Sequence, residues 1–201
     1  MRQLLIIISI AVLHVGSYYS VGLINSNRPS SVIYDFHTVI DSWIPYLGWT
    51  WVFYYFGDLY ISVWTAIVVL KLSDKKFRRA IYAYTGMIIT GALLQIALPG
   101  KAPWPKDLIS PQQFMHNLIS MRPYACLPSM HVALTMLTIC ILYSVFKSMW
   151  IRLFSTVLAI LIIISTLTLK EHFFLDALTG GILALIFYGF WRLGSKGNRT
   201  V

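Results

Sequence analysis

The feature that most constrains this chain is a series of long apolar stretches with very few charged residues. The 201 residues are 58% hydrophobic and only 11% charged, whereas about a quarter of the residues in a soluble domain are charged. A membrane-spanning helix needs about 20 mainly apolar residues, and suitable stretches lie near 4–24, 50–70, 81–98, 128–146, 153–169 and 174–191. Backbone groups in lipid must be satisfied within their own segment. We therefore predict an all-α, polytopic membrane protein with six transmembrane helices, forming a single domain over residues 1–201.

The basic residues are unevenly distributed between the two sides that this topology creates. With a cytoplasmic N-terminus, eleven of the sixteen Lys and Arg residues face inward: Arg2, the five within KLSDKKFRR (71–79), Lys147, Arg152, Arg192, Lys196 and Arg199. Cytoplasmic loops of membrane proteins carry such an excess. Topology therefore explains the net charge of +9, and we expect no nucleic-acid partner. Both termini are expected to be cytoplasmic.

Two segments lie on the predicted outer side. The first, 25–49, mixes aromatic residues with Asp35, His37 and Asp41. It can be interpreted as an amphipathic surface helix or, preferably, as a connector with an interfacial aromatic belt. The second segment, 99–127, is the longest connection between predicted spans and contains five prolines. Long ordered loops are often functional.

Polar residues that suit catalysis gather at the outer ends of the last predicted spans. In TLKEHFFLDALTG (168–180), His172 and Asp176 are four residues apart, so they share one face of a helix. The aspartate can accept a hydrogen bond from one imidazole nitrogen and leave the other nucleophilic. His131, in CLPSMHVAL (126–134), is expected in the first turn of a helix on the same side. Ionisable residues at membrane depth are functional candidates.

Two chemistries suit two histidines and a carboxylate. In phosphoryl transfer, one histidine attacks phosphorus and the other protonates the leaving oxygen, while Lys and Arg stabilise the transferred group. Alternatively, the three side chains could hold a metal ion. Nearby cations would repel a dication, so we expect no metal and no cofactor. Glu171, beside His172, is expected to be a solvated interfacial residue.

The motifs resemble those of a known family. PSMH (128–131) and the spacing of Ser165, His172 and Asp176 resemble the second and third signatures of the type 2 phosphatidic acid phosphatase (PAP2) superfamily. Thr166 stands where arginine is usual in that superfamily. Lys170, two residues before the histidine, resembles the inositol phosphorylceramide synthase-like branch. YACLPSMHVA and DSWIPYLGWTW are also similar to that branch. The resemblance extends over all six predicted spans and implies a PAP2-like helical bundle.

The resemblance also implies a role for each residue. His172 would be the nucleophile that forms a phosphohistidine, Asp176 would orient it, and His131 would protonate the leaving alcohol and then activate water or an acceptor. Lys170, Ser129 and Ser165 would hold phosphate oxygens. The first family signature matches poorly, because Trp104 in PGKAPWP (99–105) occupies a place where arginine is expected. The loop cation that binds phosphate is therefore assigned jointly to Lys101, Lys106 and Arg122.

The implied activity is metal-independent hydrolysis of a lipid phosphate or diphosphate at the outer, periplasmic face of a bacterial inner membrane. The expected partners are this phosphorylated lipid and the surrounding membrane lipids, with no obligate protein partner. Three alternatives stay open at this point: a phosphotransferase that passes the phosphoryl group to another lipid alcohol, a non-catalytic phospholipid carrier, and an intramembrane hydrolase that uses Ser129. No G-x-S-x-G sequence surrounds Ser129, which disfavours the last.

Overall fold

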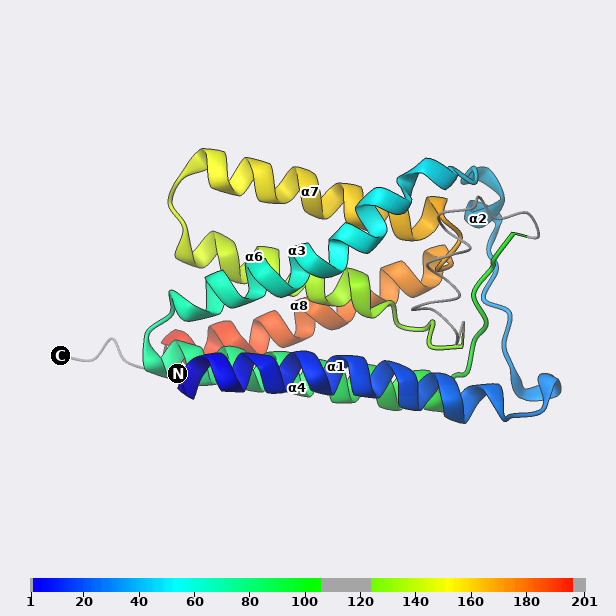
Figure 1. Cartoon of the computed structure of the whole chain (residues 1–201), viewed down its shortest axis with the longest axis horizontal. Coiled ribbons are helices and arrows are strands. Elements are labelled where there is room, and N and C mark those ends of the chain that lie inside the picture. Colours follow the sequence, from blue (N-terminus) through cyan, green and yellow to red (C-terminus); the bar gives the residue numbers. More distant parts are fainter. Residues whose placement is uncertain (1, 106–123, 197–201) are drawn as a thin grey trace.

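Long helices dominate the fold, which a computed structural model describes for residues 2–105 and 124–196 (Figure 1). The long helices are α1 (Arg2–Ser26), α3 (Trp51–Leu70), α4 (Asp74–Ala97), α6 (Met130–Val145), α7 (Met149–Thr168) and α8 (Phe174–Lys196). Each coincides with one of the predicted apolar stretches. The largest difference is at α4, which begins in the charged sequence DKKFRRA because Asp74 is favourable in the first turn of a helix. The prediction of an all-α fold is confirmed for the described residues.

Five of these helices are long and apolar enough to cross a membrane: α1, α3, α4, α7 and α8. The sixth predicted span, α6, is apolar but has only 16 residues. It is the innermost helix and packs against α3, α4, α7 and α8. The structure therefore supports five spans by length and composition, and the crossing by α6 stays a prediction.

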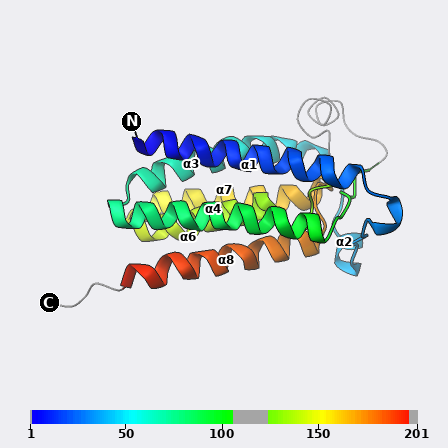
Figure 2. The ribbon, with the colours of Figure 1, turned by 90° about the horizontal axis from the view of Figure 1, so that it is seen from below.

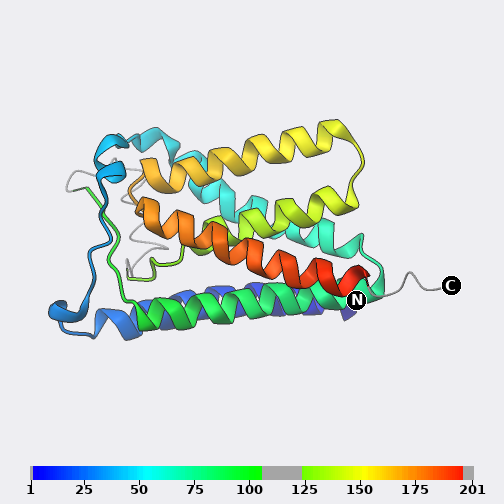
Figure 3. The same ribbon diagram turned by 180° about the vertical axis from the view of Figure 1, so that it is seen from behind.

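The apolar core lies between α3, α4, α6 and α8. Tyr84, Met87, Leu137 and Ile141 are completely buried there. Hydrogen bonds join the same helices, because the Thr138 hydroxyl lies 2.8 Å from that of Thr65 and 2.9 Å from that of Tyr84. Such polar contacts help to hold helices together where lipid gives no hydrophobic driving force between them. In contrast, α1 packs along α4 and touches α3 (Figures 1 and 3).

The two ends of the bundle differ. The beginning of α1 and the end of α8 lie at one end, whereas the connection between α1 and α3 lies at the other (Figures 1 and 2). This connection contains the short elements η1 (Ser30–Val32), α2 (Val39–Trp43) and η2 (Gly48–Thr50), and an isolated bridge joins Tyr34 to Gly100. With only five residues in α2, segment 25–49 is a connector and not an extended amphipathic helix.

Candidate active site

The turn between α7 and α8 sets the position of His172. The Thr166 carbonyl accepts hydrogen bonds from the backbone N–H groups of Glu171 and His172, both at 3.1 Å. Lys170 adopts a left-handed conformation with φ 60°, which is uncommon for a residue with a side chain. This tight reversal closes α7 and directs His172 into the protein, where it is only 6% exposed.

Asp176 holds the His172 ring, as its spacing predicts. Asp176 Oδ2 lies 3.3 Å from His172 Nδ1 and accepts a 2.9 Å hydrogen bond from the Phe173 N–H. The second bond is half of a capping box, in which a side chain in the first helical turn binds the backbone just before the helix. Asp176 is completely buried. The aspartate therefore fixes both the start of α8 and the ring that precedes it.

His131 reaches the same place from α6. Ser129 is the N-cap of this helix, since its side chain accepts from the Val132 N–H at 3.4 Å. Pro128 therefore precedes the cap. The Ser129 N–H donates to the Asp176 carbonyl at 2.9 Å, which joins the start of α6 to α8. The ring centroids of His131 and His172 are 6.2 Å apart.

Tyr54, on α3, is a member of the site that the motifs do not indicate. Its ring lies 4.5 Å from that of His131 between centroids, and its hydroxyl is 3.5 Å from His131 Nδ1. A single buried tyrosine among the many aromatic residues of 43–64 carries no distinguishing pattern. Tyr54 reaches the site because α3 packs against α6.

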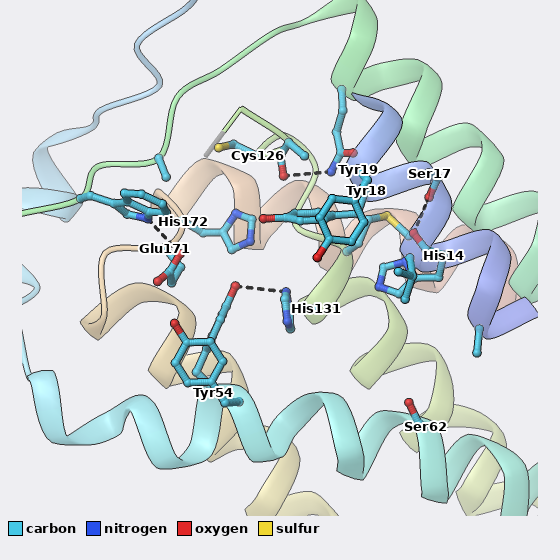
Figure 4. Close-up of a pocket in the computed structure, with 18 residues that line it drawn as sticks. His14, Ser17, Tyr18, Tyr19, Tyr54, Ser62, Cys126, His131, Glu171 and His172 are labelled. Carbon is cyan, nitrogen blue, oxygen red and sulfur yellow. Dashed lines mark hydrogen bonds between the residues drawn. The ribbon is translucent and has the colours of Figure 1, made fainter. Parts of the chain in front are cut away.

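A cavity of about 240 Å³ connects these side chains. His131, His172, Tyr54 and Glu171 line it at the site, and residues of α1 complete its wall (Figure 4). Because both histidines border one cavity, a single phosphoryl group inside it can contact both rings. The predicted trio of His131, His172 and Asp176 is thus brought together.

Glu171 differs from expectation. The prediction of a solvated interfacial carboxylate is wrong, because Glu171 is only 5% exposed and lines the cavity. Its Oε2 accepts a 2.9 Å hydrogen bond from Trp104 Nε1. Trp104 occupies the place where the family resemblance leads one to expect arginine. Here an indole N–H, a neutral donor, binds the carboxylate.

The described residues among the predicted phosphate ligands have different surroundings. Ser129 is completely buried at the cap of α6, and the Ser165 hydroxyl donates back to the Ile162 carbonyl at 2.7 Å. The Lys170 ammonium donates to the carbonyls of Asp41 and Ile44, at 3.0 and 2.6 Å, and is not part of the cavity wall. Lys101 is exposed beside Ala102, which is part of that wall. Lys106 and Arg122 lie outside the described residues.

Asp41 links the outer connector to the site. Its Oδ1 accepts from the Phe174 N–H at 2.7 Å, and its Oδ2 accepts from the N–H and hydroxyl of Thr38 at 2.8 and 2.6 Å. Burial raises the pKa of Asp41, but these hydrogen bonds outweigh it, and the pKa lies below its usual value. Burial lowers the pKa of Lys170, and the charge of Asp41 partly opposes this. The Asp41 carboxylate thus caps the start of α8, where the helix dipole favours negative charge.

Among the described residues, no group of three or more His, Cys, Asp and Glu side chains is arranged to hold a metal ion. Cys126 lines the cavity, but it is buried, and burial raises the pKa of its thiol well above the usual value. A thiol in this state is a poor nucleophile at neutral pH. The histidines are the stronger nucleophile candidates.

Comparison with known proteins identifies the family. No curated protein and no solved structure matches the chain. The family model that describes the PAP2 superfamily matches residues 30–190, a range that contains His131, His172, Asp176 and every helix except α1 in full or in large part. Because this match covers most of the chain, the protein belongs to the PAP2 superfamily, whose members are typically phosphatases.

Proposed function

We propose that the protein is an integral-membrane lipid phosphatase that hydrolyses a phosphate monoester or diphosphate through a phosphohistidine on His172. The observation that carries this proposal is the buried His172–Asp176 pair, which borders the same cavity as His131. Family membership supports phosphatase or phosphotransferase chemistry on lipids. We further propose that the site faces the periplasm, because the basic residues concentrate at the opposite end of the bundle.

The proposed first step uses both histidines. Nδ1 of His172 faces Asp176, so Nε2 carries the lone pair that attacks phosphorus. The phosphorus–oxygen bond to the lipid breaks, and the leaving oxygen takes a proton from His131. The Asp176 carboxylate stabilises the positive charge that develops on the His172 ring. In the second step His131 takes a proton from water, water attacks phosphorus, and the phosphorus–nitrogen bond breaks.

Negative charge on the transferred group needs stabilisation. None of the described side chains that line the cavity belongs to Lys or Arg. The backbone N–H groups of Met130 and His131, at the start of α6, are suitable donors, since a helix N-terminus attracts anions. Lys101, Lys106 and Arg122 remain the proposed cations. Ser129, Ser165 and Lys170 shape the site, and we also propose them for the phosphate contacts that the motifs lead us to expect.

Phosphate release by the purified protein in detergent micelles tests this function. The panel contains phosphatidic acid, phosphatidylglycerol phosphate, a polyprenyl diphosphate and phosphorylated lipid A. The His172→Ala variant should release no phosphate and form no acid-labile phosphoprotein, while Asp176→Asn and His131→Ala should lower kcat/KM by about 100-fold or more. Unchanged release by His172→Ala would disprove the phosphohistidine mechanism.

Two further measurements define the chemistry. We expect activity to survive excess EDTA and to be inhibited by vanadate, which adopts the five-coordinate geometry of the transition state. Activity that is lost in EDTA and restored by Zn or Mg would contradict the metal-free mechanism. Phosphorylated lipid formed from an added lipid alcohol, in place of free phosphate, would identify a phosphotransferase. Saturable lipid binding without turnover would identify a carrier.

A further inference from the structure

A second hollow of the protein lies far from the two histidines, where the start of α4 packs against the end of α8. These two helix ends lie at the end of the bundle opposite the candidate site (Figures 1 and 3). The groove between them has a volume of about 310 Å³ and is lined by Arg79, Tyr82 and Ala83 of α4 and by Phe187, Phe190 and Trp191 of α8. On each helix these residues are three and four positions apart, so they share one face.

The base of this groove is fixed by a contact between the two helices. Trp191 is only 3% exposed, and its Nε1 donates to the Lys76 carbonyl at 3.3 Å. Tyr82 and Phe190, on facing helices, are 73% and 65% exposed. The groove therefore has a fixed base between two exposed aromatic side chains, and it is open to the surroundings of the bundle.

Arg79 is the charged residue of the groove wall in the described part of the chain. Its side chain is half-buried, and its Nη1 is buried without a hydrogen-bond partner among the described residues. An arginine that only extends toward water keeps its charged head solvated. A buried charged donor that is left unsatisfied costs free energy. Stability of the bundle alone therefore does not account for this arrangement.

No acidic side chain of α4 or α8 neutralises the groove. The acidic residues in these two helices are Asp74 and Asp176. Asp74 is exposed and accepts from Gln3 Nε2 at 3.5 Å, whereas Asp176 binds His172 at the other end of the bundle. Arg79 is instead preceded on α4 by three exposed cations: Lys75, Lys76 and Arg78. The net positive charge favours an anionic ligand.

The depth of Arg79 indicates what kind of anion fits. Arg79 is the sixth residue of α4, about 7.5 Å along the helix from Asp74, where the charged first turns give way to apolar residues. Further along, a Cβ on Gly86 would contact the Phe187 ring, so the aromatic part of the groove lies on the bilayer side of Arg79. A ligand that fills the groove is thus anionic at one end and apolar at the other.

An anionic phospholipid has this arrangement. A guanidinium binds phosphate oxygens through paired hydrogen bonds, and basic pockets between membrane helices bind anionic lipid headgroups. A soluble phosphate would pair with Arg79 but would leave the aromatic side chains uncovered. An acyl chain that continues from the phosphate can cover Tyr82 and Phe187.

We propose that this groove binds an anionic phospholipid, with its phosphate at Arg79 and the first part of an acyl chain against Tyr82 and Phe187. The lipid belongs to the leaflet opposite the candidate site, which is the cytoplasmic leaflet in the proposed topology. It is a structural ligand that joins α4 to α8 and not a substrate, because it binds at the far end of the bundle from His172.

The test measures the Tm of the delipidated, full-length protein in dodecyl maltoside during titration with dioleoyl phosphatidylglycerol. The Tm should rise and saturate, since a ligand stabilises the state that binds it. Dioleoyl phosphatidylcholine, which has no net charge, should raise the Tm less. Glycerol 3-phosphate, which has the phosphate but no acyl chain, should leave the Tm unchanged. Equal shifts with all three compounds, or no shift with phosphatidylglycerol, would overturn the proposal.

Two arginine variants locate the effect. Arg79→Gln should weaken the apparent Kd for phosphatidylglycerol tenfold or more, in line with the loss of hydrogen bonds to a charged group. Arg79→Lys, which keeps the charge but not the planar fork, should have an intermediate effect. Arg78→Gln is the matched control, because it removes the same charge from an exposed neighbour outside the groove wall. Equal weakening by Arg78→Gln and Arg79→Gln would show that the lipid responds to overall charge and not to the groove.

The Tm without added lipid separates a binding role from a structural one. Arg79→Gln should not lower this Tm, because the variant removes a buried charged nitrogen that has no partner among the described residues. A decrease of the same size with and without phosphatidylglycerol would assign Arg79 to a contact within the chain. His172→Ala should respond to phosphatidylglycerol as wild type does. The groove is therefore tested independently of the phosphatase function.

Discussion

At the scale of single residues, Asp41 illustrates how a side chain outside any motif supports the site. It accepts three hydrogen bonds, one of them from the first residue of α8. The sequence gives no sign of this, because Asp41 and Phe174 are 133 positions apart. In the sequence, Asp41 is only one of several polar residues in an aromatic-rich segment.

Asp41→Asn should destabilise the protein in a pH-dependent way. An amide has one acceptor oxygen and cannot replace a carboxylate that serves three donors, so we expect a loss of about 1–3 kcal/mol at neutral pH. The pKa of Asp41 is lowered in the folded state, so its stabilising effect is present above the usual Asp value of about 4. It is lost as the pH falls through the lower, folded-state pKa. The Tm difference between variant and wild type, measured in detergent, should therefore shrink in acid; a constant difference would contradict this origin.

Lys170 also binds differently from what its motif predicts. Its spacing from His172 suggested a phosphate ligand, but its ammonium binds two carbonyls of the outer connector. That orientation follows from the left-handed turn and from α2, neither of which is visible in the motif. The two roles predict different consequences for a variant.

If Lys170 mainly holds the connector, Lys170→Met should lower the Tm by an amount equivalent to about 1–3 kcal/mol. Inhibition by vanadate should then remain close to that of wild type. Lys75→Met serves as the control, because Lys75 is exposed and lies at the start of α4, away from the site. An unchanged Tm with greatly weakened vanadate inhibition would instead identify Lys170 as a direct phosphate ligand.

At the scale of helices, the close contact between α6 and α8 determines how the two histidines meet. A Cβ on Gly180 would clash with the Ser129 carbonyl oxygen. That neighbour is backbone and cannot rotate away. Glycine at 180 therefore lets the start of α6 approach α8 closely enough for the hydrogen bond between Ser129 and Asp176.

Gly180→Ala should displace the first turn of α6, and with it His131. Overpacking of this kind costs about 1–3 kcal/mol, and a displacement of about 1 Å lowers catalysis about 100-fold. The control is Gly189→Ala on the same helix, where the added Cβ meets nothing within 4 Å. This variant should be as active as wild type and equally or slightly more stable, because alanine favours helix. Equal activity of both variants would show that the contact does not position His131.

The helices and the central pair could be predicted from sequence because they depend on local patterns. Apolar runs determine the spans, and the spacing of four residues places His172 and Asp176 on one face. Tyr54, the burial of Glu171 and the orientation of Lys170 could not be predicted, since each depends on contacts between distant segments. Trp104 and Glu171, for example, are 67 positions apart. The phosphate cations stay predictions, because Lys106 and Arg122 lie outside the described residues.

At the scale of the whole molecule, the helices place the candidate site and the cationic run 71–79 at opposite ends (Figures 1 and 3). In a background of Cys126→Ala and Cys140→Ala, Ser31→Cys should react with a membrane-impermeant thiol reagent in intact spheroplasts. Ser73→Cys should react only after lysis. Both serines are exposed, so access to the reagent depends on the side of the membrane. The reverse labelling would place the site in the cytoplasm.

The shortness of α6 also has a consequence for the bilayer. Its 16 residues extend about 24 Å, less than the hydrocarbon thickness of about 30 Å. Its far end is level with its neighbours (Figure 1), so the shortfall lies at His131, and the proposed mechanism requires the lipid phosphate to enter below the headgroup layer. In a thinner membrane, the lipid phosphate has a shorter distance to move before it reaches His131. A difference between helix length and bilayer thickness also costs free energy for each ångström. Turnover should therefore rise when the enzyme is reconstituted in phosphatidylcholine with shorter acyl chains, which would make membrane thickness a control on the reaction rate.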